Sequence, residues 1–291
     1  AQSVNYRQAE ADRLYEQGNK QYRISQFQQA LQSWEQSLAV YREIGNHLGE
    51  AKSLENLGLA YSKIGNYRKA IHYHQQSLGI FSIIKYLRGK AISLENLGLN
   101  YSKIGNYHTA IDYHQKSLII KRKVFNRRGE ANSLQSIGFA YFNLGKYHTA
   151  KDYYQQSLAI FSKIQYPLGK ANSLQLLGLW YENHGDYYKV IDYYKQSLAI
   201  KKEINNYQGE ANSLLGLGGA YSRLGEHHKA IDYYQQSLAI FSKIEYRRGE
   251  ANSLLGLGNA YSRLGEQHKA IDYYQQSLTI FSKIEYSLGE A

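Results

Sequence analysis

The stretch that decides the fold is residues 249–288, GEANSLLGLGNAYSRLGEQHKAIDYYQQSLTIFSKIEYSL. Small and apolar residues recur in it every three or four positions, from Ala251 to Tyr261 and again from Ala270 to Phe281. This spacing places them on one face of a helix. The stretch therefore predicts two helices, at roughly 250–264 and 267–284, with Gly265 ending the first and Leu288-Gly289 marking the passage to a following unit.

The same pattern recurs along the chain with a period of 40 residues. Similar helix starts occur at Gly49, Gly89, Gly129, Gly169, Gly209 and Gly249, and a divergent copy begins at Ala9. We therefore predict seven helical hairpins, at 9–48, 49–88, 89–128, 129–168, 169–208, 209–248 and 249–288. Residues 1–8 lead in, and residues 289–291 begin a truncated further unit. Hairpins that pack on one another in sequence form an all-α solenoid.

Four spacings within the unit make the resemblance to a known family specific. Gly258 follows a leucine, Tyr261 comes three residues later, Ala270 nine after that and Tyr274 four after that. This pattern resembles the tetratricopeptide repeat (TPR), which implies a right-handed α-solenoid of seven helix-turn-helix units. Units of 40 residues are similar to those of LGN/Pins adaptors, kinesin light chains and bacterial Rap regulators. They are especially similar to those of cyanobacterial multi-TPR proteins, some of which carry a CHAT protease domain.

The resemblance covers residues 9–288 and departs from the usual 34-residue unit in two ways. The proline that ends the second helix is missing. Six extra residues, such as FSKIEY at 281–286, are expected to lengthen the second helix.

Composition excludes several classes of protein. The 291 residues are 43% hydrophobic and 20% charged, which suits a folded chain with a sizeable core. The absence of cysteine removes disulfides, thiolate metal sites and cysteine nucleophiles. No apolar run approaches a membrane span, and no catalytic, metal-ligand or phosphate-binding motif is present. We predict a non-enzymatic protein without cofactor or metal.

Most recurring residues are predicted to pack between helices. Gly258 and Ala270 and their counterparts lie where paired helices cross, where a larger side chain would hold the backbones apart. His74 and His114 occupy a position that holds tyrosine in later units, so they are expected to replace it in packing. Gly216 and Gly256 interrupt the first helices of two units, and close helix packing is the favoured explanation over approach of a partner.

The resemblance implies that the first helix of each unit lines a concave surface that binds peptides. When Ala251 and its counterparts are counted as position 1, asparagine occupies position 2 in four successive units, at Asn132, Asn172, Asn212 and Asn252. An amide both donates and accepts, so such a ladder can hold a peptide backbone. Decoration of an exposed first turn is the alternative. The other groove residues predicted are Leu215, Leu255, Asn259, Arg223, Arg263, Phe139 and Leu179.

Positive charge is concentrated in two units. Residues 49–128 contain 14 Lys and Arg against 4 Asp and Glu, whereas the net formal charge of the whole chain is +11. Lys52, Lys63 and Lys103 are predicted to form a basic patch on the concave side, and Lys121, Arg122, Lys123, Arg127 and Arg128 to cluster near the end of a second helix. An acidic peptide or protein complements such a surface, while no nucleic-acid-binding signature favours RNA or DNA.

Two function hypotheses follow. The first is a scaffold that binds peptide or protein partners in the groove. The alternative is the regulatory or sensor arm of a larger enzyme, such as a CHAT protease, whose catalytic domain lies outside this chain; an RNA-binding helical repeat is a weaker third. The second helix of the last unit has no following unit to cover Ile271 and Leu278, so end-to-end self-association is expected. The first residues fit a cleaved signal peptide or a trimmed chain equally, which leaves the compartment open between cytoplasm and export.

Overall fold

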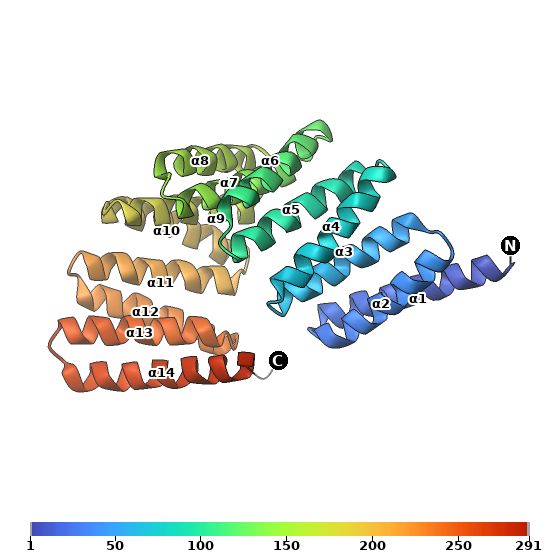
Figure 1. Cartoon of the computed structure of the whole chain (residues 1–291). Helices are drawn as coiled ribbons and strands as arrows, with labels where there is room; N and C mark the ends of the chain where they lie inside the picture. Colours follow the sequence, from blue (N-terminus) through green and yellow to red (C-terminus); the bar gives the residue numbers. More distant parts are fainter. Residues whose placement is uncertain (1, 290–291) are drawn as a thin grey trace. The chain divides into compact units, whose positions relative to one another are not determined.

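A computed structural model describes residues 2–289, with side chains for residues 4–284. The described residues form fourteen helices and no strand, and consecutive helices pack against each other in pairs (Figure 1). The predicted all-α solenoid of helical repeats is confirmed. Across the described part of the chain, no helix is long and apolar enough to cross a bilayer, and no cluster of acidic or histidine side chains suits a metal ion.

The chain divides into two compact units, Ala1–Tyr153 and Tyr154–Ala291. The helices of the first are α1 (Gln2–Arg23), α2 (Phe27–Glu43), α3 (His47–Lys63), α4 (Tyr67–Ile83), α5 (Leu87–Lys103), α6 (Tyr107–Lys123) and α7 (Arg127–Asn143). The helices of the second are α9 (Pro167–Asn183), α10 (Tyr187–Glu203), α11 (Tyr207–Arg223), α12 (His227–Lys243), α13 (Arg247–Arg263) and α14 (Gln267–Gly289). Helix α8 (Tyr147–Lys163) contributes to both. Odd-numbered helices are the first helices of the hairpins and even-numbered ones the second.

Short turns with a defined chemistry separate the helices. After α3 the chain turns through Gly65, whose φ of +83° suits glycine, and the Asn66 side chain then caps α4 by accepting a hydrogen bond from Lys69 N at 3.1 Å. Gly265, with φ of +80°, follows the end of α13 in the same way. The prediction that Gly265 ends the first helix is confirmed.

The predicted boundaries at the other end of the first helix are wrong. Helix α13 begins at Arg247 rather than near Glu250, and Gly249 lies inside its first turn. A Cβ on Gly249 would come within 2.5 Å of the Phe241 ring, so this glycine permits a close contact instead of breaking the helix. The passage between units is therefore at 244–246, and Leu288-Gly289 is part of α14.

The extra residues of the unit also divide differently from the prediction. In the sixth unit, Phe241, Ser242 and Lys243 extend α12, whereas Ile244, Glu245 and Tyr246 form the turn before α13. Both helices of a hairpin consequently reach the same length of 17 residues, as α11 and α12 show. Only in α14 does the whole FSKIEY segment remain helical.

The packing predictions for the small residues are confirmed. A Cβ on Gly58 or Gly98 would come within 2.6 Å of the His74 or His114 ring, and both histidines are fully buried in the position that tyrosine takes elsewhere. Cβ atoms on Gly216 and Gly256 would similarly clash with the rings of buried tyrosines in the preceding second helices. Close packing explains these two glycines without a partner.

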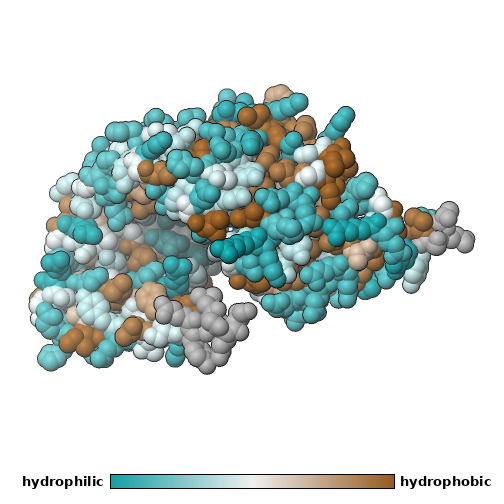
Figure 2. All heavy atoms as spheres, viewed as in Figure 1, coloured by the Kyte–Doolittle hydropathy of each residue, from teal (hydrophilic) through white to brown (hydrophobic). Residues whose placement is uncertain are grey.

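Aromatic side chains mark both units. Stacked tyrosine pairs join the two helices of a hairpin, with ring centroids 5.4 Å apart for Tyr61 and Tyr73. Trp34 is 2% exposed and packs over Gly18 in the first unit, and Trp180 is 6% exposed and stacks on His184 in the second. Hydrophobic residues also remain at the surface among the polar ones (Figure 2).

The outer face of α14 is open. Ile271 is 50% exposed and Leu278 is 66% exposed, whereas Ile231, which corresponds to Ile271 in α12, is 7% exposed because α13 covers it. This agrees with the predicted lack of cover, while the self-association expected from it stays a prediction. The truncated further unit predicted at 289–291 lies outside the described residues beyond Gly289.

Candidate functional site

The first helices of neighbouring hairpins contact one another. In the first unit α1 contacts α3, α3 contacts α5 and α5 contacts α7, and in the second α11 contacts α13. Side-chain hydrogen bonds support these contacts, such as the one from Asn56 Nδ2 to Asn19 Oδ1 at 2.9 Å. Within each unit the first helices therefore form a continuous surface, which we call the A face.

The four predicted asparagines lie on the A face, Asn132 in the first unit and the other three in the second. Asn212 is exposed and the other three are half-buried. None of the four side chains forms a hydrogen bond within the described chain. By contrast, the side-chain amide of Asn96 donates a hydrogen bond to Glu55 Oε1. The ladder asparagines thus keep donors and acceptors open to solvent or to a partner.

The remaining predicted groove residues are also accessible. Phe139 and Leu255 are each 41% exposed, which is a large apolar surface to leave in water. Leu215 and Leu179 are half-buried, and Arg223 and Arg263 are exposed. Asn259 is already engaged, because its Oδ1 accepts a hydrogen bond from Tyr274 Oη at 2.9 Å.

Two cavities open on the A face of the first unit. One, of about 610 Å³, lies between α5 and α7 and has Ile92 and Asn132 in its lining. The other, of about 300 Å³, lies between α1 and α3, and Asp12 and Lys52 line it. All four residues occupy the repeat position of the asparagine ladder, which is the sixth residue of α3, α5 and α7, so this position faces recesses between neighbouring first helices.

The predicted basic residues separate into two groups. Lys52, Lys63 and Lys103 are exposed and form no ion pair among the described residues, as expected for a basic patch. In the cluster near the end of α6, three of the five basic residues form ion pairs instead. Arg122 and Arg127 both bind the carboxylate of Glu130 at 2.8 Å, and Lys121 is buried.

Four matches to the family model for tetratricopeptide repeats decide the family. They cover residues 7–82, 89–163, 130–203 and 209–283. The chain belongs to the tetratricopeptide repeat family. The comparison with curated proteins gave no match.

Solved TPR structures share the fold. The apo form of RapI has a TM-score of 0.77 at 16% identity, with 95% of this chain and 99% of that chain covered. A Rap protein complexed with competence and sporulation factor has a TM-score of 0.71 at 16% identity, covering 97% and 76%. A putative kinesin light chain from Podosopora anserina has a TM-score of 0.54 at 21% identity, covering 66% and 95%. The predicted resemblance to TPR, Rap and kinesin-light-chain arrays is confirmed, and at these identities it concerns the fold alone.

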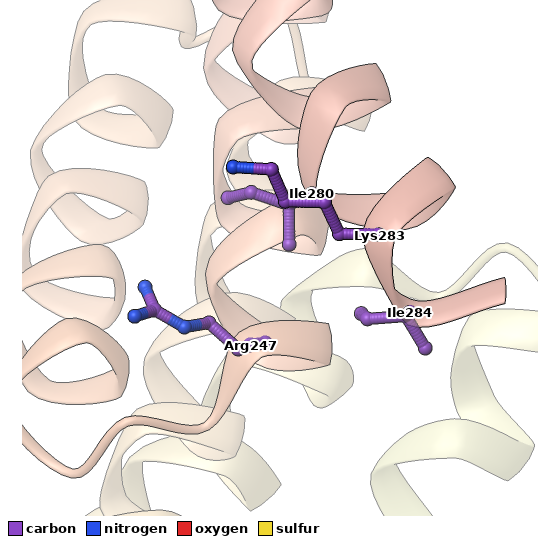
Figure 3. A pocket seen from close by; sticks show the side chains of 4 residues that line it. All are labelled: Arg247, Ile280, Lys283 and Ile284. Atoms are coloured by element: carbon purple, nitrogen blue, oxygen red, sulfur yellow. The ribbon is translucent and has the colours of Figure 1, made fainter. Parts of the chain in front are cut away.

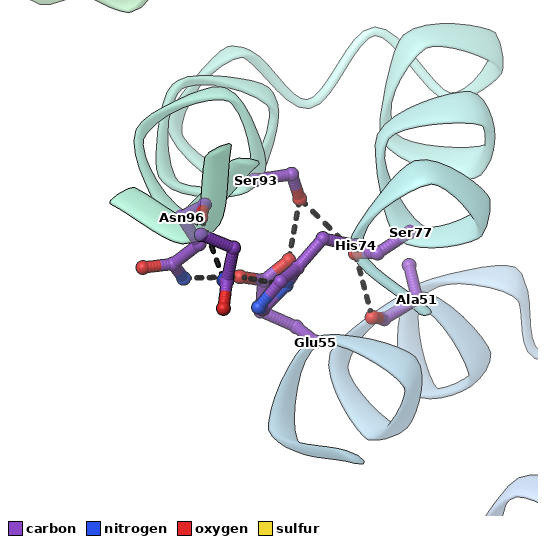
Figure 4. A network of polar contacts seen from close by, with 7 residues as sticks. Ala51, Glu55, His74, Ser77, Ser93 and Asn96 are labelled. Carbon is purple, nitrogen blue, oxygen red and sulfur yellow. Dashed lines mark hydrogen bonds and ion pairs between the residues drawn. The ribbon is translucent and has the colours of Figure 1, made fainter. Parts of the chain in front are cut away.

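Sequence reasoning missed a buried polar network in this TPR array, between α3, α4 and α5 (Figure 4). Glu55 is 6% exposed, lies 3.0 Å from His74 Nδ1 and accepts hydrogen bonds from Ser93 and Asn96. Burial acts to raise the pKa of Glu55, but His74 and the two donors outweigh it and hold this pKa below its ordinary value. The network joins two neighbouring TPR units beneath the A face.

Sequence reasoning also missed two buried lysines at a position that holds phenylalanine in four units and Tyr41 in the first. Phe81, Phe161 and Phe241 are 0–2% exposed at this position, whereas α6 has Lys121 and α10 has Lys201. Lys121 Nζ lies 2.7 Å from Glu95 Oε2 and donates to Ser133 Oγ at 2.9 Å. Lys201 Nζ donates to the amide oxygen of Gln175, and burial lowers the pKa of Lys201 to about 8. Alignment of the TPR units by column was the signal that could have identified them.

A further recess lies away from the A face. Ile280, Lys283 and Ile284 of α14 line it together with Arg247 of α13 (Figure 3). Its lining consists of two isoleucines, one lysine and one arginine.

Proposed function

We propose that this TPR array is a non-catalytic scaffold that binds extended peptide segments of partner proteins along its A face. TPR and Rap-like folds generally mediate protein or peptide binding. The observation that carries the proposal is the set of four equivalent asparagines whose amides have no partner within the described chain. Neighbouring first helices pack about 10 Å apart, close to three residues of extended chain at about 3.3 Å each.

Apolar and basic side chains of the A face in each unit define the partner further. Phe139 and Leu255 provide surface for large apolar side chains of a peptide. Lys52, Lys63 and Lys103 favour acidic residues, because none of the three forms an ion pair among the described residues. The proposed ligand is therefore an extended segment with apolar and acidic side chains.

The test is selection of binders from a displayed random-peptide library, followed by measurement of their affinity for variants. Replacing Asn212 and Asn252 together by alanine is expected to weaken binding by roughly tenfold or more, because each lost contact to a buried peptide group costs about 1–3 kcal/mol. The matched control replaces Gln235 and Gln275, exposed amides on α12 and α14, and should leave the affinity unchanged. Equal affinities in both double variants would show that the amide ladder does not hold the peptide.

The alternative of a regulatory arm within a larger enzyme stays a prediction. Self-association through α14 and binding of nucleic acid likewise stay predictions.

A further inference from the structure

A second groove lies on the side of the second helices, between α4, α5 and α6. It encloses about 480 Å³, and Leu78, Leu94 and Ile120 supply its apolar lining. Leu94 is only 3% exposed, so it forms a buried floor between the two second helices. The repeats are so alike that a residue which differs from its counterparts in most other units is easy to recognise. Three such residues line this groove.

The first departure is an exposed isoleucine. Ile119 is 65% exposed at a position that holds Ala39, Gly79, Ala159, Ala199, Ala239 and Thr279 in the other units. On the neighbouring helix, Ile83 is 79% exposed at a position that holds only lysine or glutamate elsewhere. Ile83 lies one helical turn after Gly79, the counterpart of Ile119, so both isoleucines belong to the same outward stripe. Hydrophobic residues are visible at the surface over the α5–α6 region (Figure 2).

The other two departures are lysines. Lys116 lines the groove where every other unit has glutamine, and Lys90 lines it where five units have glutamate, at Glu10, Glu50, Glu130, Glu210 and Glu250. At three of those junctions the glutamate pairs with a basic residue of the preceding helix, as Arg42 does with Glu50 at 2.8 Å. Here Ser82 and Lys90 replace that pair, so the junction is cationic and uncompensated.

Acidic residues are few on the second helices that flank this groove, and Asp112, one helical turn before Lys116, forms no ion pair with it among the described residues. Helix α4 contains no Asp or Glu, and α6 contains only Asp112. An apolar groove flanked by lysines complements a segment with the opposite charge and a large apolar side chain. A second copy of this chain fits poorly, because its net formal charge is +11.

We propose that this groove docks a helical segment of a partner protein in which leucine-like side chains are flanked by acidic residues. The apolar side chains would rest on Leu78, Leu94 and Ile119, and the acidic residues would face Lys90 and Lys116. This surface is formed by α4, α5 and α6 away from the asparagine ladder. The array would then hold two partners, or two segments of one partner, at once.

The test uses the full chain and a fluorescein-labelled amphipathic peptide with leucine at every third or fourth position and glutamate elsewhere. We expect saturable binding by fluorescence anisotropy. Ile119→Ala, Lys116→Gln and Lys90→Glu each install the residue of other units, so the fold is retained, and each should weaken binding roughly tenfold. A peptide with glutamine in place of glutamate should bind roughly tenfold more weakly and lose its dependence on salt.

The matched control is Lys170→Glu, at the corresponding serine–lysine junction in the second unit, where Ala199 replaces the isoleucine. It should change the affinity less than about twofold, as should the Asn212 and Asn252 double variant. Failure of the acidic peptide to bind, or equal losses from Lys170→Glu and Lys90→Glu, would overturn the proposal. So would binding of phosphatidylserine vesicles that depends on Ile119 while the peptide does not bind, since the surface would then recognise lipid.

Discussion

Lys121 in the first unit and Lys201 in the second occupy the same repeat position but are stabilised differently. Each is buried, with 3% and 2% exposed surface, at a position that holds phenylalanine or tyrosine in the other units. Lys121 has the carboxylate of Glu95 beside it, whereas Lys201 has the neutral amide of Gln175. Glu95 and Gln175 are themselves equivalent residues of α5 and α9.

The comparison shows how one exchange on a neighbouring first helix decides whether a buried cation is balanced. Burial disfavours the ammonium form of both lysines, and a carboxylate offsets that cost while an amide does so only in part. Burial accordingly lowers the pKa of Lys201 from 10.5 to about 8. Mutation can put glutamine at the position of Glu95 and glutamate at that of Gln175, which makes the difference testable.

The largest effect is expected from Glu95→Gln, which gives Lys121 the surroundings of Lys201. Loss of one partner of a buried ion pair leaves the other charge uncompensated, so the free energy of unfolding should fall by about 3–5 kcal/mol. Denaturant unfolding at pH 7 measures it. Glu210→Gln is the control, because its ion pair to the exposed Lys202 spans 3.9 Å and should contribute less than about 1 kcal/mol. Similar losses in both variants would mean that the buried pair is no more important than a surface pair.

Lys201→Phe should act in the opposite direction and raise the free energy of unfolding by about 3 kcal/mol at pH 7, at about 1.4 kcal/mol per pKa unit. The lysine's folded-state pKa of about 8 lies below its ordinary 10.5. The penalty is therefore fully present below pH 8 and fades as the pH rises to 10.5. The stability difference between the variant and the natural chain should shrink over that interval.

Gln175→Glu provides the complementary check on Lys201. It supplies the carboxylate that Lys121 already has, so it should abolish most of the pH dependence between 8 and 10.5 while retaining the lysine. An unchanged pH dependence would show that the amide and the carboxylate are equivalent at this site.

A smaller effect is expected at acid pH from His114. Burial, together with the charge of Lys121, lowers the pKa of His114 to about 4. Its ordinary value is 6.5, so the unfolded chain takes up a proton that the folded chain does not, and stability is lost as the pH falls from 6.5 to 4. His114→Tyr, the residue of later units, should remove about 2 kcal/mol of this loss at pH 5. His108→Tyr, an exposed site on the same helix, should leave the acid profile unchanged.

Repetition made much of the fold predictable. Gly58, Gly98 and their counterparts recur at fixed spacing, which identified helix pairing and the family without further information. The turn between hairpins was placed wrongly because glycine has two uses: Gly249 was interpreted as a break, whereas it admits the Phe241 ring. Composition alone does not distinguish these uses.

The candidate site was predictable only where side chains point outward. Asn212 is exposed and the other three asparagines are half-buried, and their contact with a peptide stays a prediction. Lys121 was assigned to a basic surface cluster, but it is buried because Glu95, 26 residues earlier, reaches it from another helix. Such pairing depends on how hairpins stack, which local charge patterns do not report. The Glu55 network was missed for the same reason.

The positions of Trp34 and Trp180 have a consequence for observing the array. These are the two tryptophans of the chain, and each is buried in a different compact unit. Tryptophan emission in the Trp34→Phe variant reports the second unit alone, and emission in the Trp180→Phe variant reports the first. Unfolding of a repeat array is set by the stability of each repeat and the coupling between neighbours. If the two unfolding curves coincide, the two units unfold cooperatively, which requires coupling through α8. If the curves are separated, the difference in their midpoints shows that the coupling at α8 is too weak to make the units unfold together.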